Sequence, residues 1–170
     1  FVPCMHEIAE RKARVRVLGD LSLFPADVRE LLIEAQKESE AYEGRGVNVA
    51  LGYGSRAEIV RAANIAVKEG RELTEESLSA LLYTAGQPDP DLIIRTGKEL
   101  RLSNFLLWQS AYAELYFSEK LFPDFSDRDL DEALKEYAGR KRRFGKTDEQ
   151  MENPSAEKEE KNTKEKKTDE

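Results

Sequence analysis

The residues best suited to chemistry lie between positions 95 and 103, where two arginines and a serine occur close together. Residues 92–94 form a short apolar run that predicts a strand buried on both faces, and Arg95 stands where this strand ends. In open α/β sheets, ligands collect outside the carboxyl ends of the strands, so we expect Arg95 and Arg101 to face a crevice. Guanidinium groups bind phosphate through paired hydrogen bonds. This segment is therefore a candidate site for a phosphate or diphosphate.

Ser103 precedes an apolar run at residues 104–109 and is predicted to cap a helix there. Such a helix would add a hydroxyl and free backbone N–H groups to the same anion site. An alternative is an ordinary polar crossover, in which Arg95 pairs with a neighbouring carboxylate, namely Asp89, Asp91 or Glu99. Because the chain holds neither a Walker A sequence nor a GxGxxG sequence, the spacing alone leaves both interpretations open.

Strands alternate with helices along the chain, which favours an α/β fold with a parallel sheet and helices on both faces. The predicted strands are residues 15–18, 47–51, 92–95 and 115–117. The predicted helices cover residues 3–12, the span from Pro25 to Gly44, the span from Ser55 to Gly70, a short stretch capped by Thr74, a stretch from Asn104, and the span from Ser126 to the basic cluster at 140–143.

Composition narrows the class of protein. The net charge of −7 argues against a general nucleic-acid binder, which needs a basic surface to neutralise phosphates. No apolar run approaches the roughly 20 residues that span a bilayer. Cys4 is the only cysteine, so an internal disulfide is excluded and a cytoplasmic location is the simplest expectation. His6, the only histidine, falls in the first predicted helix, where an exposed structural role is expected.

The last 25 residues differ from the rest of the chain. Residues 146–170 are rich in lysine and acidic residues and hold no aromatic residue. Such a segment cannot bury enough apolar surface to offset its ordering entropy, so it is predicted to be a disordered charged tail. The alternative is a tail that contacts a membrane or a partner, although its mixed charge argues for a solubilising role. Residues 1–145 are left as one domain.

The run Ile-Arg-Thr-Gly-Lys-Glu-Leu-Arg-Leu-Ser-Asn-Phe-Leu-Leu-Trp-Gln at residues 94–109 resembles the C-terminal signature of the cis-prenyltransferases. This is the undecaprenyl diphosphate synthase family, which includes the dehydrodolichyl and archaeal polyprenyl diphosphate synthases. Further blocks occur in the family's order at residues 17–20, 23–25, 48–59, 82–86, 111–117, 122–125 and 142–145. The family's His-x-x-Met-Asp-Gly-Asn-x-Arg segment is not found. The resemblance implies the C-terminal part of a longer enzyme, with a parallel central sheet that is incomplete at the N-terminus.

The resemblance also implies an activity. The family joins isopentenyl diphosphate to an allylic prenyl diphosphate, with Mg²⁺ as cofactor, and so makes the long-chain precursor of a glycosyl carrier lipid. The chain alone is expected to be inactive. The working protein is expected to be a homodimer whose product brings it into peripheral contact with a membrane. The runner-up is a non-catalytic partner subunit of a heteromeric enzyme, and a third possibility is a phosphate-binding α/β module of unrelated chemistry.

The resemblance assigns roles residue by residue. Arg95 and Arg101 are the catalytic cations, and together with Ser103 they bind the diphosphate of isopentenyl diphosphate. The other assigned residues are Glu99, which orients the arginines; Glu114, a metal ligand; Arg143 and Gly145, which reach the partner subunit's active site; and Asn48, Tyr53 and Arg56, which support the site. For Glu114 the alternative is a strand-end carboxylate held by an arginine.

Two positions depart from the family pattern. Lys98 stands where glycine is usual, next to the expected diphosphate contacts, and either adds a cation there or points outward. Gly52 stands where asparagine is frequent, so one hydrogen-bonding side chain is lost.

Overall fold

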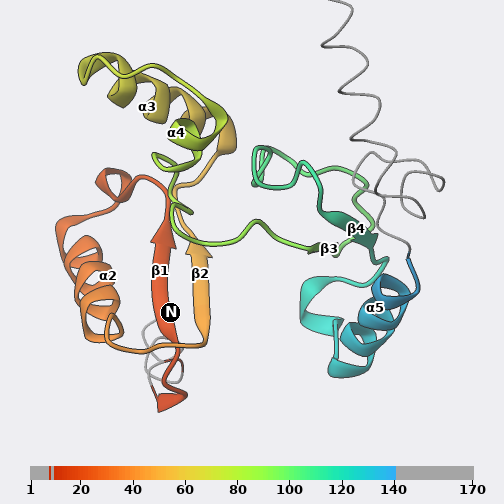
Figure 1. Cartoon of the computed structure of the whole chain (residues 1–170). Helices are drawn as coiled ribbons and strands as arrows, with labels where there is room; N and C mark the ends of the chain where they lie inside the picture. Colours follow the sequence, from red (N-terminus) through yellow and green to blue (C-terminus); the bar gives the residue numbers. More distant parts are fainter. Residues whose placement is uncertain (1–7, 9, 141–170) are drawn as a thin grey trace, which may run out of the picture. The chain divides into compact units, whose positions relative to one another are not determined.

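A computed structural model describes residue 8 and residues 10–140 of the chain. The described residues fall into two compact units (Figure 1). One lies within Phe1–Asp91 and Leu100–Ala113, and the other within Leu92–Glu99 and Glu114–Glu170. Most of the predicted helix over residues 3–12 lies outside the described residues, which include only residues 8 and 10–12 of it. The predicted charged tail also lies outside them. No helix within the described ranges is long and apolar enough to cross a membrane.

The first unit is built on a parallel strand pair. β1 (Arg14–Leu18) pairs with β2 (Gly46–Ala50), with Val17 opposite Val49, and α2 (Ala26–Glu38) connects them. The predicted strands are therefore confirmed, and so is the helix after Pro25, although it ends at Glu38 and not near Gly44. Figure 1 shows α2 beside β1. Two polar side chains, one on α2 and one at its C-cap, bond the strand. Gln36 Oε1 accepts from the Val17 N–H at 2.8 Å and Ser39 Oγ accepts from the Val15 N–H at 2.9 Å, which satisfies backbone donors at a strand edge.

Two further helices complete this unit. α3 (Ser55–Lys68) buries Ala62 and Ala66 completely, as expected for small residues on its inward face. α4 (Glu75–Ser79) is preceded by Thr74, whose side chain accepts from the Ser77 N–H while the Ser77 hydroxyl accepts from the Thr74 N–H. The helix that begins at Ser55 and the short helix capped by Thr74 are both confirmed.

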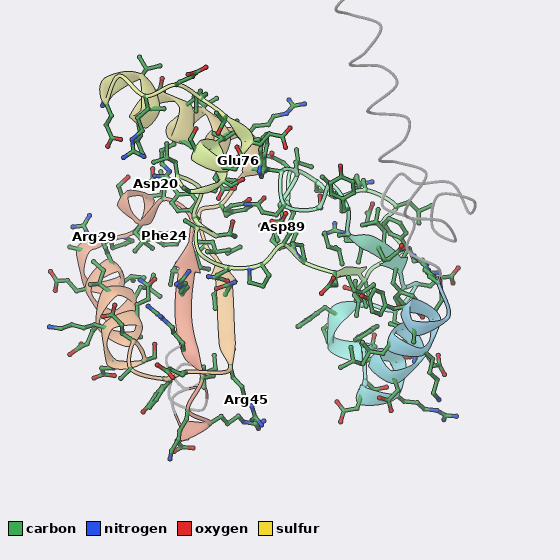
Figure 2. The ribbon with its side chains drawn as sticks, in the orientation of Figure 1. Asp20, Phe24, Arg29, Arg45, Glu76 and Asp89 are labelled. Carbon is green, nitrogen blue, oxygen red and sulfur yellow. The ribbon has the colours of Figure 1, made fainter. Side chains whose placement is uncertain are left out.

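The loops at the carboxyl ends of β1 and β2 lie against each other. Asp20 accepts from the Ser22 N–H at 2.9 Å and so caps the 3₁₀ turn η1 (Leu21–Leu23). Gly52, at φ +59°, packs against the Asp20 carbonyl and the Phe24 ring, both labelled in Figure 2. An added Cβ at Gly52 would lie 2.9 Å from the Asp20 carbonyl oxygen, so the close approach requires glycine there.

The second unit repeats the parallel arrangement. β3 (Leu92–Arg95) pairs with β4 (Glu114–Phe117), with Leu92 opposite Glu114, and α5 (Asp127–Gly139) packs beside β4. Both strands were predicted at these positions. The α/β class with parallel strands is thus confirmed, and in the described residues the strands form two separate two-stranded sheets.

Two further helix predictions are wrong: one helix does not form, and another ends earlier than expected. Residues 103–112 form successive turns rather than a helix, with positive φ at Ser103, Asn104 and Leu106. The predicted helix dipole after Ser103 is therefore not present. The last helix ends at Gly139, before the basic cluster, because Arg140 turns to an extended backbone (φ −81°, ψ 136°).

Asp129 fixes the start of α5. Its carboxylate accepts from the Ser126 N–H at 2.8 Å, from the Ser126 hydroxyl at 2.7 Å and from Lys120 Nζ at 2.6 Å. These partners favour the charged form, and the Lys120 bond first of all holds the pKa of Asp129 well below its ordinary value of 3.8. The Asp129 carboxylate thus links Ser126, at the start of α5, to Lys120, in the segment that follows β4.

This network predicts an acid-sensitive fold. Because the pKa of Asp129 is lower in the folded state, its stabilising effect is complete above about pH 5 and is lost progressively as the pH falls below that value. Asp129→Asn should therefore lower stability at pH 7 and flatten the loss of stability between about pH 4 and 2. Urea unfolding at several pH values measures this, with the exposed Asp131→Asn as control. Equal pH profiles for Asp129→Asn and the unaltered protein would contradict the assignment.

Candidate functional site

The segment that carries Ser103 is bonded to the first turn of α3. The Ser55 N–H donates to the Asn104 carbonyl at 2.9 Å, and the Arg56 N–H donates to Asn104 Oδ1 at 2.9 Å. Ser55 Oγ in turn accepts from the Leu107 N–H at 3.0 Å. Two of the predicted site residues, Ser103 and Arg56, are thereby brought to the same place in the first unit. Sequence reasoning missed the residue that links them, Asn104.

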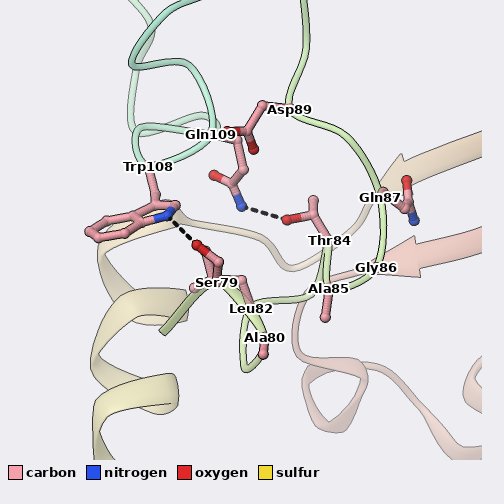
Figure 3. Close-up of a pocket in the computed structure, with 10 residues that line it drawn as sticks. All are labelled: Ser79, Ala80, Leu82, Thr84, Ala85, Gly86, Gln87, Asp89, Trp108 and Gln109. Atoms are coloured by element: carbon pink, nitrogen blue, oxygen red, sulfur yellow. Dashed lines mark hydrogen bonds between the residues drawn. The ribbon is translucent and has the colours of Figure 1, made fainter. Parts of the chain in front are cut away.

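A buried carboxylate holds three segments of the first unit together. Glu58 is 1% exposed and accepts from the Tyr53 hydroxyl at 2.6 Å, the Tyr83 N–H at 2.8 Å and Gln109 Nε2 at 3.3 Å. Gln109 also donates to Thr84 Oγ1 at 3.0 Å, as drawn in Figure 3. Tyr53, predicted to support the site, is thus bonded to Glu58, and its supporting role stays a prediction. The only available sequence signal for Glu58 was its position among apolar residues on α3.

The two tyrosines of this network are kept neutral. Burial first, and then the hydrogen bond to Glu58, raises the pKa of Tyr53 well above its ordinary value of 10.0. Burial likewise raises the pKa of Tyr83, while the Arg61 guanidinium, 4.1 Å from the ring centroid, opposes that rise. Arg61 also donates to the Leu81 carbonyl at 2.6 Å. These contacts fix the chain that follows α4 onto α3.

A pocket of about 230 Å³ lies beside this network (Figure 3). Trp108 and Gln109 form one side and Leu82 and Thr84 the other, and Trp108 Nε1 donates to the Ser79 hydroxyl at 3.0 Å. Within the described part of the chain, the buried Gln109 Oε1 has no hydrogen-bond partner. A single orphan acceptor fits a bound water better than a charged substrate.

Asn48 lies on β2 with its side chain exposed, and it exchanges two amide hydrogen bonds with Gln87. The pairing fixes the loop that leads toward β3. Asn48 thus has a partner in the structure, and its role in supporting the substrate site stays a prediction.

Arg95 ends β3, as the sequence predicts. Its Nε is buried and has no hydrogen-bond partner among the described residues. Its carbonyl accepts from the Ser118 N–H at 2.7 Å, which extends the pairing of β3 and β4 by one hydrogen bond beyond the end of β4. Buried polar groups of proteins are normally paired, and an acceptor from a ligand or a water would complete this nitrogen, as it would the equally orphaned Nε of Arg61 in the first unit.

The loop after Arg95 settles the orientation of Lys98. The Gly97 N–H donates to the Lys120 carbonyl at 2.6 Å and the Lys98 N–H donates to the Ser118 carbonyl at 3.1 Å. Lys98 has φ +61°, a left-handed conformation that glycine adopts without cost. Its side chain is 72% exposed and pairs with Glu119 at 3.9 Å, so it points outward. Glu99 follows in the same loop and is half-buried.

Glu114 pairs with an arginine. Arg140 Nη1 donates to Glu114 Oε2 at 2.7 Å and to the Leu115 carbonyl at 3.1 Å, and the bond to Glu114 raises the pKa of Arg140 above its ordinary value. No group of three or more metal-binding side chains is found in the described ranges. With its carboxylate held by a cation, Glu114 does not form a metal site with the described residues alone.

The predicted site residues are divided between the two units. Arg95, Glu99 and Glu114 belong to the second unit, whereas Arg101, Ser103, Asn48, Tyr53 and Arg56 belong to the first. Arg143 and Gly145 lie outside the described residues. The convergence of Arg95, Arg101 and Ser103 on one anion therefore stays a prediction.

Comparison with known proteins identifies the family. The family model described as "Putative undecaprenyl diphosphate synthase" matches residues 3–145, and the chain belongs to this family. An isoprenyl transferase of Chromobacterium violaceum is 45% identical over 150 residues, which are 86% of this chain and 60% of the relative. One from Thermus thermophilus is 45% identical over 152 residues, 83% of this chain and 58% of the relative.

Solved structures confirm the fold. A probable undecaprenyl diphosphate synthase from Campylobacter jejuni matches with a TM-score of 0.76 and 40% identity, covering 84% of this chain and 67% of that one. Lavandulyl diphosphate synthase from Lavandula x intermedia, in complex with dimethylallyl diphosphate, matches with a TM-score of 0.77 and 36% identity, covering 84% and 64%. The chain spans about 60% of the length of the curated relatives named above.

The Glu58 network predicts a large loss of stability when the carboxylate is removed. Glu58→Ala leaves the Tyr53 hydroxyl and the Tyr83 N–H without their acceptor and leaves the Gln109 amide with Thr84 alone, and should lower the free energy of unfolding by roughly 2–4 kcal/mol. Tyr53→Phe, which removes one donor, should cost about 1 kcal/mol. Denaturant unfolding measures both, with the exposed Glu72→Ala as control. A Glu58→Ala loss no larger than that of Glu72→Ala would show that the network does not stabilise the unit.

Proposed function

We propose that the protein is a cis-prenyltransferase that adds isopentenyl diphosphate units to an allylic prenyl diphosphate and so makes a long-chain polyprenyl diphosphate, the precursor of a glycosyl carrier lipid. Family membership supports the reaction class. The observation in the structure that supports it best is the buried Nε of Arg95, which lacks a partner among the described residues and lies at the end of β3, where a sheet of this class binds ligands.

Each proposed site residue has a physical task. Arg95 and Arg101 neutralise the diphosphate of isopentenyl diphosphate, because a guanidinium presents a fork of N–H donors that matches phosphate oxygens. The Ser103 hydroxyl donates a further hydrogen bond. Glu99, half-buried in the loop between the arginines, orients their side chains so that less rotamer freedom is lost on binding.

In the reaction, the double bond of isopentenyl diphosphate attacks the allylic carbon, the allylic C–O bond breaks, diphosphate leaves, and a proton is lost from the five-carbon unit. Groups that hold the diphosphate of the attacking unit fix its double bond beside the allylic carbon, and such positioning lowers the barrier. The chain's contribution is thus to bind and orient isopentenyl diphosphate.

Mg²⁺ is the proposed cofactor because charge develops on the departing diphosphate. Glu114 is the candidate ligand, and its ion pair with Arg140 means that it needs further metal ligands and a shifted Arg140. In the family, an aspartate of the Asp-Gly-Asn segment supplies such a ligand. The proposed metal site therefore includes residues beyond those that the structure describes.

We also propose a homodimer in which Arg143 and Gly145 of one subunit reach the active site of its partner. The resemblance to the family's Arg-x-Gly element supports this assembly. Any contact with a membrane would be peripheral and would follow from the long apolar product.

The first test is prenyl transfer by the full-length protein. Radiolabelled isopentenyl diphosphate with farnesyl or geranylgeranyl diphosphate should give a butanol-extractable product.

Arg101→Ala should raise KM for isopentenyl diphosphate and lower kcat, each by roughly tenfold or more, because a bond to a charged group is lost in both ground and transition states. Arg71→Ala, an exposed arginine of the same unit, is the matched control. An unchanged KM in Arg101→Ala would remove this residue from the site, and no transfer by the folded protein would refute the proposed reaction.

The second test concerns the metal. Chelation by EDTA should abolish transfer and added Mg²⁺ should restore it, while Glu114→Gln should raise the Mg²⁺ concentration needed for half-maximal rate. Arg140→Gln is the contrasting variant, because it removes the ion-pair partner of Glu114 but keeps the carboxylate. It should lower the stability of the protein without abolishing the response to Mg²⁺. Full activity in EDTA would contradict the metal requirement.

A further inference from the structure

The first turn of α3 lacks a capping side chain of its own. The residue at its N-cap position is Gly54, which cannot accept a hydrogen bond from the free N–H groups of the first turn. Asn104 accepts in its place, since the Arg56 N–H donates to Asn104 Oδ1 at 2.9 Å. A residue almost fifty positions further along the chain thus caps the helix.

The missing side chain of Gly54 makes room for this contact. Its φ of −157° is an extended conformation that any residue adopts, so the backbone does not require glycine. An added Cβ at Gly54 would lie only 2.8 Å from Asn104 Nδ2, however. The space that Gly54 leaves free is the space that the Asn104 side chain fills.

The same contact holds an unfavourable backbone. Ser103 and Asn104 are both left-handed, with φ +50° and +63°, a conformation that serine rarely adopts and that asparagine tolerates better. Three hydrogen bonds to Ser55 and Arg56 hold this stretch in place. Ser103 therefore owes its position to Asn104 and α3, and not to a helix of its own.

We propose that Asn104 is a positioning residue for the isopentenyl diphosphate site: it locks the Ser103 segment onto the first turn of α3 and presents the Ser103 hydroxyl. The inference rests on the proposed function, in which Ser103 binds the diphosphate. It predicts that loss of Asn104 weakens isopentenyl diphosphate binding more than it affects the allylic substrate.

Two variants separate positioning from helix capping. Asn104→Ala in the full-length protein removes the side-chain bond that caps α3 and anchors the Ser103 segment, and leaves only the two bonds made by Ser55. Asn104→Ala with Gly54→Ser returns a local cap to α3 in the space that the asparagine leaves, but does not return the anchor. Both should raise KM for isopentenyl diphosphate roughly tenfold, with KM for the allylic substrate changed less than twofold, and only the double variant should regain thermal stability. Recovery of KM together with stability in the double variant would overturn the inference, because Asn104 would then serve the fold alone.

A single substitution tests the contact from the other side. Gly54→Ala should displace the Asn104 side chain and raise the same KM, whereas Gly46→Ala, whose Cβ would lie 3.9 Å from the nearest atom, is the matched control. Hydrogen exchange gives a readout that needs no activity: amides of residues 55–56 and 104–107 should exchange faster in Gly54→Ala and in Asn104→Ala. Unchanged exchange in both would refute the positioning role even if the unaltered protein transfers prenyl groups. Absence of transfer by the unaltered protein would instead refute the proposed function.

Discussion

The buried carboxylate of Glu58 is the constraint on which the first unit depends. A carboxylate that is 1% exposed is costly unless hydrogen-bond donors replace the lost water, so Tyr53, the Tyr83 N–H and Gln109 must all meet it at once. These donors come from the loop before α3, the chain after α4 and the segment after Arg101. One side chain on α3 thereby decides where three otherwise independent loops lie.

The segment that carries Ser103 is held at two points. Gln109 ties its far end to Glu58, and Asn104 ties its near end to the first turn of α3. Between these points the backbone follows turns rather than a helix. Catalytic and binding groups work best when their surroundings hold them in place before the ligand arrives, and hydrogen bonds from a rigid helix provide that support.

Local patterns predicted the regular elements well, and tertiary contacts explain the failures. The apolar run before Arg95 predicted β3 to the residue, and Thr74 and Ser126 marked two helix starts. The helix expected after Ser103 did not form because Asn104 bonds α3 instead, a partner that no local pattern reveals. Both departures from the family pattern, Gly52 and Lys98, lie at positive φ. Composition could not show whether Lys98 would face the site, since its contact with Glu119 arises only from the pairing of β3 with β4.

We propose above all that Arg95, Arg101 and Ser103 hold one diphosphate. A crystal structure of the full-length protein with a non-hydrolysable thio analogue of isopentenyl diphosphate tests it most directly. The account predicts that both guanidinium groups and the Ser103 hydroxyl lie within hydrogen-bond distance of the same diphosphate, with the Nε of Arg95 no longer orphaned. A diphosphate bound elsewhere, or these side chains engaged in separate protein contacts while the analogue is bound, would contradict it.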